Sequence, residues 1–125
     1  MIKIAYVDDS SVQQDLVVEW LNYYTATKGV TLNYTIFNNG EDLIADVESK
    51  GSYDIYILDI ILPGIRGTDV SDKLKELGAS GLQIFLTASA AFEKRVDAFG
   101  YLVKPIQPEQ LYAMLDRAIP AIQNN

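Results

Sequence analysis

The sequence predicts an α/β fold in which helices cover both faces of one parallel β-sheet. Short apolar runs of the kind found in buried parallel strands recur along the chain, and amphipathic helical patterns separate them. The length of 125 residues and the hydrophobic content of 49% suit one domain with one core. We therefore expect a single doubly wound domain over residues 1–125.

The predicted strands are short runs of mainly Ile, Val, Leu, Phe and Tyr. A continuous apolar run of this length is typical of a strand that is buried on both faces of its sheet. In chain order the strands are Ile2–Val7, Thr31–Phe37, Ile55–Leu58, Leu82–Leu86 and Tyr101–Val103. Because helical patterns lie between them, these five strands are expected to be parallel.

The first predicted helix follows the first strand. Ser10 or Ser11 is expected to cap its start, and Gly29 to mark its end. Apolar residues recur along it at helical spacing, which predicts one face toward the core. That face is expected to contain Val12, Leu16, Val17, Trp20, Leu21 and Tyr24.

Four further helices are predicted from capping residues and apolar spacing. They are expected to open at residues 38–41, to span Thr68–Leu77 with Gly78 as the stop, to lie within Ala88–Phe99, and to span Pro108–Ile119. The inward residues of the second and fifth helices are expected to be Leu43, Ile44, Val47, Leu111, Met114, Leu115 and Ile119.

Composition excludes several kinds of chemistry. The chain has no cysteine and no histidine, so thiol nucleophiles, disulfides and histidine-based acid–base or metal chemistry are excluded. A net charge of −7 argues against direct nucleic-acid binding. No apolar run approaches the length of a membrane span, and the first strand begins at once. We expect a soluble, cytoplasmic protein without membrane contact.

Polar residues stand where four of the predicted strands end. Asp8 and Asp9 follow the first strand, Asp59 the third, Thr87 the fourth and Lys104 the fifth. An Asp after a strand is often only a turn former, and Lys104 alone could be solvated surface. In a parallel sheet, however, all these ends meet at one edge, where ligands bind. We therefore expect the five residues to form one site.

Carboxylates that lie close together repel each other unless a cation neutralises them. Oxygen ligands with room for water suit Mg²⁺ better than zinc or calcium. Asp59 is then a candidate nucleophile that forms an aspartyl phosphate, while Lys104 and Mg²⁺ offset the charge of the transferred oxygens.

The full set of residues resembles the receiver domain of two-component response regulators over essentially the whole chain. The matching residues are Asp8-Asp9, Asp59 followed by Pro63-Gly64, Thr87-Ala88, Tyr101 and Lys104-Pro105. The resemblance implies a flavodoxin-like (βα)5 sheet with strand order 2-1-3-4-5. It also implies a signalling module, not a metabolic enzyme, that catalyses its own phosphorylation and dephosphorylation.

The resemblance assigns a role to each matching residue. Asp59 is the phosphoacceptor, and its phosphate comes from a sensor histidine kinase or a histidine phosphotransfer protein. Mg²⁺ is bound by Asp9, by Asp8 partly through water, by Asp59 and by the backbone carbonyl of Ile61. The phosphoryl group accepts a hydrogen bond from Thr87, forms an ion pair with Lys104, and lies beside the backbone N–H groups of Ile60 and Ala88. Tyr101 is the aromatic switch, and the Lys104-Pro105 bond is expected to be cis.

The chain also departs from the common receiver pattern. The segment from Thr87 to Lys104 is shorter by roughly one helical turn, which predicts a shortened fourth helix. Receivers commonly form a homodimer or bind an output domain through the face of their fourth helix, fifth strand and fifth helix. The shortened helix places this mode of contact in doubt. Apolar Ile61 predicts a long-lived phosphate, because it disfavours an in-line water. The stretch DAFGYLVKPI resembles receivers joined to LytTR-type DNA-binding domains, so the chain could be the N-terminal part of a longer regulator.

Three alternative functions fit the sequence less well. A degenerate receiver that acts only as a protein interaction module would have no reason to keep so many costly polar positions. A phosphatase of the haloacid dehalogenase type needs two Asp residues spaced two apart after the first strand, whereas here Asp8 and Asp9 are adjacent. Dinucleotide binding is disfavoured because the first turn, VDDSS, lacks a glycine-rich loop.

Overall fold

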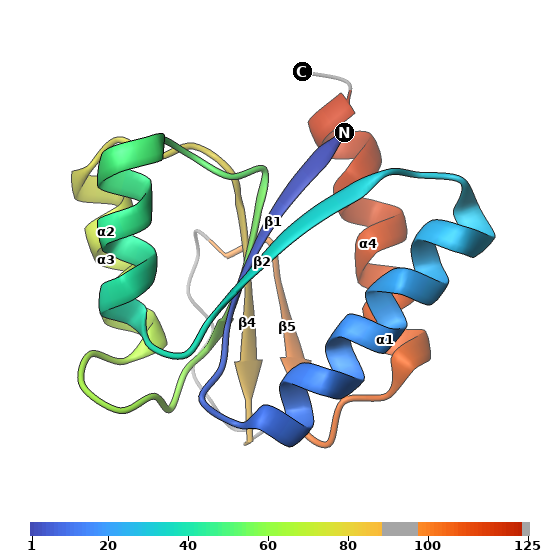
Figure 1. Cartoon of the computed structure of the whole chain (residues 1–125), viewed down its shortest axis with the longest axis horizontal. Coiled ribbons are helices and arrows are strands. Elements are labelled where there is room, and N and C mark those ends of the chain that lie inside the picture. Colours follow the sequence, from blue (N-terminus) through green and yellow to red (C-terminus); the bar gives the residue numbers. More distant parts are fainter. Residues whose placement is uncertain (89–97, 124–125) are drawn as a thin grey trace.

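A parallel β-sheet between two layers of helices forms the protein (Figure 1). The computed structural model describes residues 1–88 and 98–123. The strands are β1 (Ile2–Val7), β2 (Leu32–Phe37), β3 (Ile55–Asp59), β4 (Leu82–Thr87) and β5 (Gly100–Val103). They pair in the order β2-β1-β3-β4-β5, and every pairing is parallel. The predicted flavodoxin-like fold and strand order are therefore confirmed.

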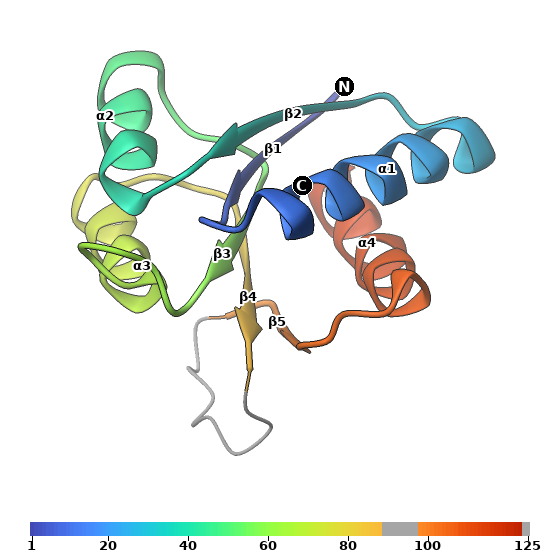
Figure 2. The same cartoon turned by 60° about the horizontal axis from the view of Figure 1, so that its bottom comes forward.

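Helices cover both faces of the sheet. Within the described residues they are α1 (Ser11–Lys28), α2 (Gly40–Lys50), α3 (Gly67–Glu76) and α4 (Pro108–Gln123). In both views α1 and α4 lie on one face, and α2 and α3 lie on the other (Figures 1 and 2). The short helix predicted within Ala88–Phe99 falls on residues 89–97, which lie outside the described residues. The predicted fifth helix is therefore α4, and it continues past Ile119 and through Pro120.

Two hydrophobic clusters fill the space between the sheet and its helices. Because successive side chains of a strand point to opposite faces, Ile4 and Tyr6 contribute to one cluster, and Ala5 and Val7 to the other. Both faces of β1 are thus buried, as the continuous apolar run predicted. The inward residues predicted for α2 and α4 are all buried: Leu43, Ile44, Val47, Leu111, Met114, Leu115 and Ile119.

The ends of α1 are capped as predicted, but its inward face is narrower than predicted. Ser10 is the N-cap, and Gly29 closes the helix in the left-handed conformation with φ of 68°. Val12 and Leu16, however, are 71% and 40% exposed. The six residues predicted to face inward span about 180° of the helix, whereas a core-facing stripe needs only about 100°. The core therefore takes the half that contains Val17, Leu21 and Tyr24, with Trp20 at its border.

No helix in the described part of the chain has the length and apolar character needed to cross a membrane.

Candidate functional site

Three carboxylates gather at the edge of the sheet where the parallel strands end. Asp8 and Asp9 follow β1, and Asp59 is the last residue of β3. One oxygen of each lies within 4.8 Å of the others. Asp8 and Asp59 are 0% and 3% exposed, whereas Asp9 faces solvent. The predicted convergence of the acids is confirmed, and the cluster is open to solvent on the side of Asp9.

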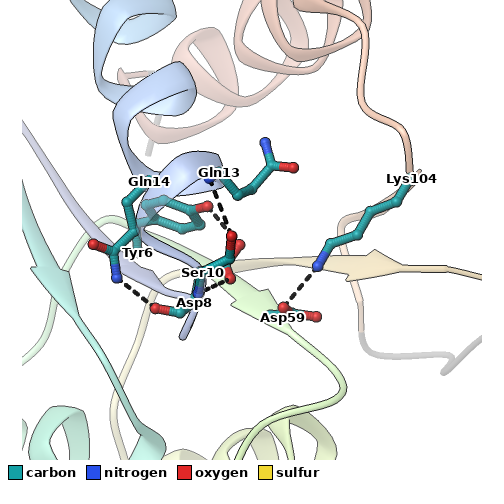
Figure 3. A network of polar contacts seen from close by, with 7 residues as sticks. All are labelled: Tyr6, Asp8, Ser10, Gln13, Gln14, Asp59 and Lys104. Atoms are coloured by element: carbon teal, nitrogen blue, oxygen red, sulfur yellow. Dashed lines mark hydrogen bonds and ion pairs between the residues drawn. The ribbon is translucent and has the colours of Figure 1, made fainter.

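The buried Asp8 carboxylate is held by two donors. The Tyr6 hydroxyl donates to Oδ2 at 2.7 Å, and the backbone N–H of Ser10 donates to Oδ1 at 3.0 Å (Figure 3). Burial is the largest cause of the raised pKa of the Tyr6 hydroxyl, and the hydrogen bond to Asp8 raises this pKa further. The hydroxyl therefore stays protonated and acts as a donor. Both oxygens of Asp8 are thus oriented by the protein before any ligand arrives.

A glutamine fixes the turn that follows β1. The Nε2 atom of Gln14 donates to the backbone carbonyl of Asp8 at 2.6 Å and to Oδ1 of Asn38 at 2.8 Å. This bridge ties the loop after β1 to the loop after β2. The roles of Tyr6 and Gln14 were not predicted from the sequence, although Tyr6 lies two residues before Asp8 and hence on the same side of the strand.

Lys104 forms an ion pair with Asp59. Its Nζ lies 2.7 Å from Oδ2 of Asp59, and the two side chains are 26% and 5% exposed (Figure 3). The Lys104 backbone N–H donates to the carbonyl of Thr87 at 2.7 Å, which extends the pairing of β4 with β5. The Lys104-Pro105 bond is cis, as expected. A residue 45 positions away from Asp59 thus supplies its counter-charge.

The electrostatic environment of Asp59 favours a bound cation. Burial raises the pKa of its carboxyl, the hydrogen bond and charge of Lys104 lower it, and Asp8 raises it again, with a raised pKa as the result. One ammonium therefore does not offset both the burial of Asp59 and the charge of Asp8. Hard oxygen ligands of this kind fit Mg²⁺, and a divalent ion would supply the missing positive charge.

Thr87 and Tyr101 lie on the neighbouring strands β4 and β5. Thr87 is buried at the end of β4, and Tyr101 is partly buried. Tyr101 pairs with Phe85 in the strand register and stacks on its ring, with centroids 5.7 Å apart. Because Phe85 and Thr87 are two residues apart, Thr87 and Tyr101 project from the same face of the sheet.

Two backbone N–H groups directly after β3 have different partners. The Ile60 N–H donates to the carbonyl of Leu86 at 3.1 Å and is therefore committed to the sheet. A backbone hydrogen bond from Ile61, in contrast, helps lower the pKa of Asp59. The Ile61 N–H is therefore directed toward the Asp59 carboxylate, and contact of the Ile60 N–H with a phosphoryl group stays a prediction. The Ile61 side chain is 61% exposed.

Gly67, at the start of α3, packs against the strand end that carries Asp59. A Cβ atom at this position would lie 2.2 Å from the Asp59 carbonyl oxygen, far inside any normal contact. The Gly67 N–H also donates to the carbonyl of Ile60 at 3.0 Å. This close approach was not predicted from the sequence, in which the third helix was expected to begin at Thr68.

The parallel sheet carries an acidic cluster and a lysine at its carboxyl edge, an arrangement that has the groups needed for metal-dependent phosphoryl transfer. The family model of the response regulator receiver domain matches residues 4–116, and the chain belongs to that family. It is therefore a receiver domain of the two-component response regulators. Such domains bind Mg²⁺ at an acidic pocket, and the cluster of Asp8, Asp9 and Asp59 has the donors for it.

Curated relatives include transcriptional regulators. The chain is 39% identical over 84 residues to the positive alginate biosynthesis regulatory protein of Pseudomonas aeruginosa, covering 65% of this chain and 34% of that protein. It is 37% identical over 83 residues to the transcriptional regulatory protein PcoR of Escherichia coli, covering 62% and 36%. The matched segment of the chain thus spans about a third of the length of these relatives.

Solved structures share the fold. The response regulator TrrA of Thermotoga maritima, solved in complex with Mg²⁺-BeF, superposes with a TM-score of 0.78 at 27% identity, covering 94% of this chain and 99% of that one. A CheY-like receiver domain from Methanospirillum hungatei superposes with a TM-score of 0.83 at 22% identity, covering 99% and 98%.

Proposed function

We propose that Asp59 is the phosphoacceptor of this receiver domain and that a phosphohistidine of a sensor kinase or a histidine phosphotransfer protein is the donor. The observation that carries the proposal is the Lys104–Asp59 ion pair of 2.7 Å beside two further carboxylates. A buried carboxylate of this kind can act as the nucleophile. The adjacent ammonium and a metal bound by the neighbouring carboxylates can then stabilise the negative charge of the phosphoryl group that it accepts.

In the proposed step a carboxylate oxygen of Asp59 attacks the phosphorus of the donor. An O–P bond forms as the P–N bond of the phosphohistidine breaks, and the electron pair of that bond returns to the imidazole nitrogen. The Lys104 ammonium then balances charge on the transferred oxygens, because it already lies beside Asp59. The Ala88 N–H and the Thr87 hydroxyl are the proposed hydrogen-bond donors to the same oxygens.

Asp8, Asp9, Asp59 and the backbone carbonyl of Ile61 are the proposed ligands of Mg²⁺. When bound, the ion supplies Lewis-acid stabilisation of negative charge on phosphoryl oxygens. The contribution of the protein is to orient the ligands. Tyr6 and Ser10 fix the two oxygens of Asp8, and Gln14 fixes the turn on which Asp8 and Asp9 lie.

Thr87 and Tyr101 are the proposed switch. Both project from one face of the sheet, and Tyr101 rests on Phe85 next to Thr87. A phosphoryl group that draws the Thr87 hydroxyl toward Asp59 would free space for the Tyr101 ring to turn inward. The change would reach the exposed edge of β5, where an output domain or a second receiver can detect it.

The domain organisation and the cellular partners belong to the same proposal. Residues 1–125 would be one regulatory domain in the cytoplasm, with an output domain of the LytTR type elsewhere in a longer regulator. The relatives include a transcriptional regulatory protein, and each is about twice as long as this chain, which supports this division. DNA binding would then belong to the output part, because this domain has a net charge of −7.

Incubation with acetyl phosphate and Mg²⁺, followed by mass spectrometry of the intact and digested protein, tests the proposal. One added phosphate on Asp59 is expected, with loss of the signal in Asp59→Asn or with a chelator. Asp116→Asn is the matched control, because Asp116 also lies beside a lysine, with Lys28 Nζ 3.6 Å away. Labelling of other carboxylates, or none in the folded wild type, would favour the degenerate interaction module.

A further inference from the structure

Helices α1 and α4 cover the same face of the sheet (Figures 1 and 2). An aromatic seam of Tyr23, Tyr24 and Tyr112 joins these two helices. The ring of Tyr112 lies 5.6 Å from that of Tyr23 and 6.1 Å from that of Tyr24, measured between centroids. At one end of the seam, the Tyr24 hydroxyl donates to Asp116 at 2.7 Å, and Lys28 lies 3.6 Å from the same carboxylate. This end of the seam therefore contains both an acid and its cation.

A groove of about 290 Å³ lies at the other end of the seam. Its lining combines aromatic rings with two acids: Glu19, Trp20, Tyr23, Pro108, Glu109 and Tyr112. Tyr23 is 58% exposed, so its ring is available to a ligand. The groove shares no residue with the acidic site around Asp59.

The two acids of the groove have no cation among the residues that the structure describes. Neither Glu19 nor Glu109 forms a salt bridge within residues 1–88 and 98–123. In the same residues, the cations that stand over rings are Lys3 over Tyr53 and Arg117 over Phe99, neither of which is in the groove. The groove thus differs from the Asp116 end of the seam, where Lys28 is present.

Both acids of the groove act electrostatically on the Tyr112 hydroxyl. Burial raises the pKa of the Tyr112 hydroxyl, and Tyr23, Glu109 and Glu19 raise it further. Glu109 has a structural explanation of its own, because an acid in the first turn of α4 complements the helix N-terminus. Glu19 has no such explanation, since it lies in the middle of α1.

We propose that this groove binds an arginine side chain of a protein partner. A guanidinium is planar and weakly hydrated, so that it can lie on aromatic faces and donate to carboxylates in the same pose. Trp20, Tyr23 and Tyr112 offer the faces, and Glu19 and Glu109 offer the acceptors. The negative charge of the chain would also attract a basic partner.

An NMR titration of the ¹⁵N-labelled protein tests the proposal. The probe is the capped tripeptide Gly-Arg-Gly, and its neutral match is capped Gly-citrulline-Gly, both in low-salt buffer. Trp20 is the single tryptophan of the chain, so its indole N–H resonance reports on the groove without ambiguity. We expect a saturable shift of this resonance with the arginine peptide, at least fivefold weaker binding of the citrulline peptide, and weakening by added salt.

The double variant Glu19→Gln/Glu109→Gln should weaken binding of the arginine peptide at least fivefold. Glu48→Gln, on the exposed surface of α2, is the control for the loss of charge and should bind as the wild type does. Glu19 and Glu109 are exposed, so the double variant should fold normally, which an unchanged melting curve would show. Equal binding of both peptides, or an unchanged affinity in the double variant, would overturn the proposal. Phosphorylation of Asp59 should be unaffected by these changes, which keeps this test independent of the proposed function.

Discussion

Replacement of Tyr6 by Phe tests whether the protein orients Asp8 for a metal. The change removes one oxygen atom, whose hydrogen bond to Asp8 Oδ2 is 2.7 Å long. Tyr6 and Asp8 are both 0% exposed, so no bulk water can replace the lost donor. The substitution therefore leaves a buried carboxylate with the Ser10 N–H as its remaining donor within the described residues.

Two magnitudes follow from this geometry. A hydrogen bond to a buried charged group contributes about 1.5–3 kcal/mol, so the free energy of unfolding of the metal-free protein should fall by roughly that amount. Loss of a partner that orients a metal ligand typically weakens metal binding about 10-fold or more. We expect the Mg²⁺ dissociation constant of Tyr6→Phe to rise by about 10-fold, equivalent to about 1.4 kcal/mol.

The affinity can be measured from the amide resonance of Ser10 during a Mg²⁺ titration, because this N–H donates to the other oxygen of Asp8 at 3.0 Å. Urea unfolding without metal gives the stability. Tyr34→Phe is the matched control, since the Tyr34 hydroxyl bonds Asn22 at 3.0 Å, away from the acids. If Tyr6→Phe lost stability but bound Mg²⁺ as tightly as Tyr34→Phe, Tyr6 would be a structural residue only, and the reasoning would be refuted.

Three further predictions concern the same edge of the sheet. Asp59→Asn should raise the melting temperature of the metal-free protein at neutral pH, because the raised pKa of Asp59 means that its charged form destabilises the fold. This advantage should shrink as the pH falls through the raised pKa and wild-type Asp59 takes up a proton; a difference that is constant with pH would contradict it. Ile61→Asn should shorten the lifetime of the phosphorylated form, because a polar side chain at this 61% exposed position can orient water; equal dephosphorylation rates would argue against this. Gly67→Ala should destabilise the fold by about 1–3 kcal/mol and weaken Mg²⁺ binding, because its Cβ would lie 2.2 Å from the Asp59 carbonyl oxygen. Unchanged urea unfolding of this variant would show that the start of α3 can shift freely.

The elements of the fold could be predicted because their signals are local. Ser10, Asn39 and Gly29 cap helices through bonds to residues three or four positions away, so nearby sequence is sufficient. The strands were recognisable from continuous apolar runs, since burial on both faces demands them. The inward face of α1 was predicted too broadly, because Val12 and Leu16 fit helical spacing equally well and only the position of the sheet decides which stripe is covered.

The members of the acidic site could be predicted because parallel strands bring their carboxyl ends to one edge. Asp8, Asp9 and Asp59 do meet there, and Lys104 reaches Asp59. The supporting residues were missed for a physical reason. The contact of Gly67 with the Asp59 carbonyl depends on how α3 is placed against β3, which no spacing in the sequence reports.

The sequence alone determined which groups are available: three acids, a hydroxyl and an ammonium after buried strands, with no histidine or cysteine. The tertiary structure alone decided how strongly they interact. Electrostatic energies depend on separation and on exclusion of water, and both are set when strands remote in sequence pack side by side. Three features are therefore properties of the folded chain: the 2.7 Å contact between Lys104 and Asp59, the raised pKa of Asp59, and the hydrogen bond from Tyr6 to Asp8.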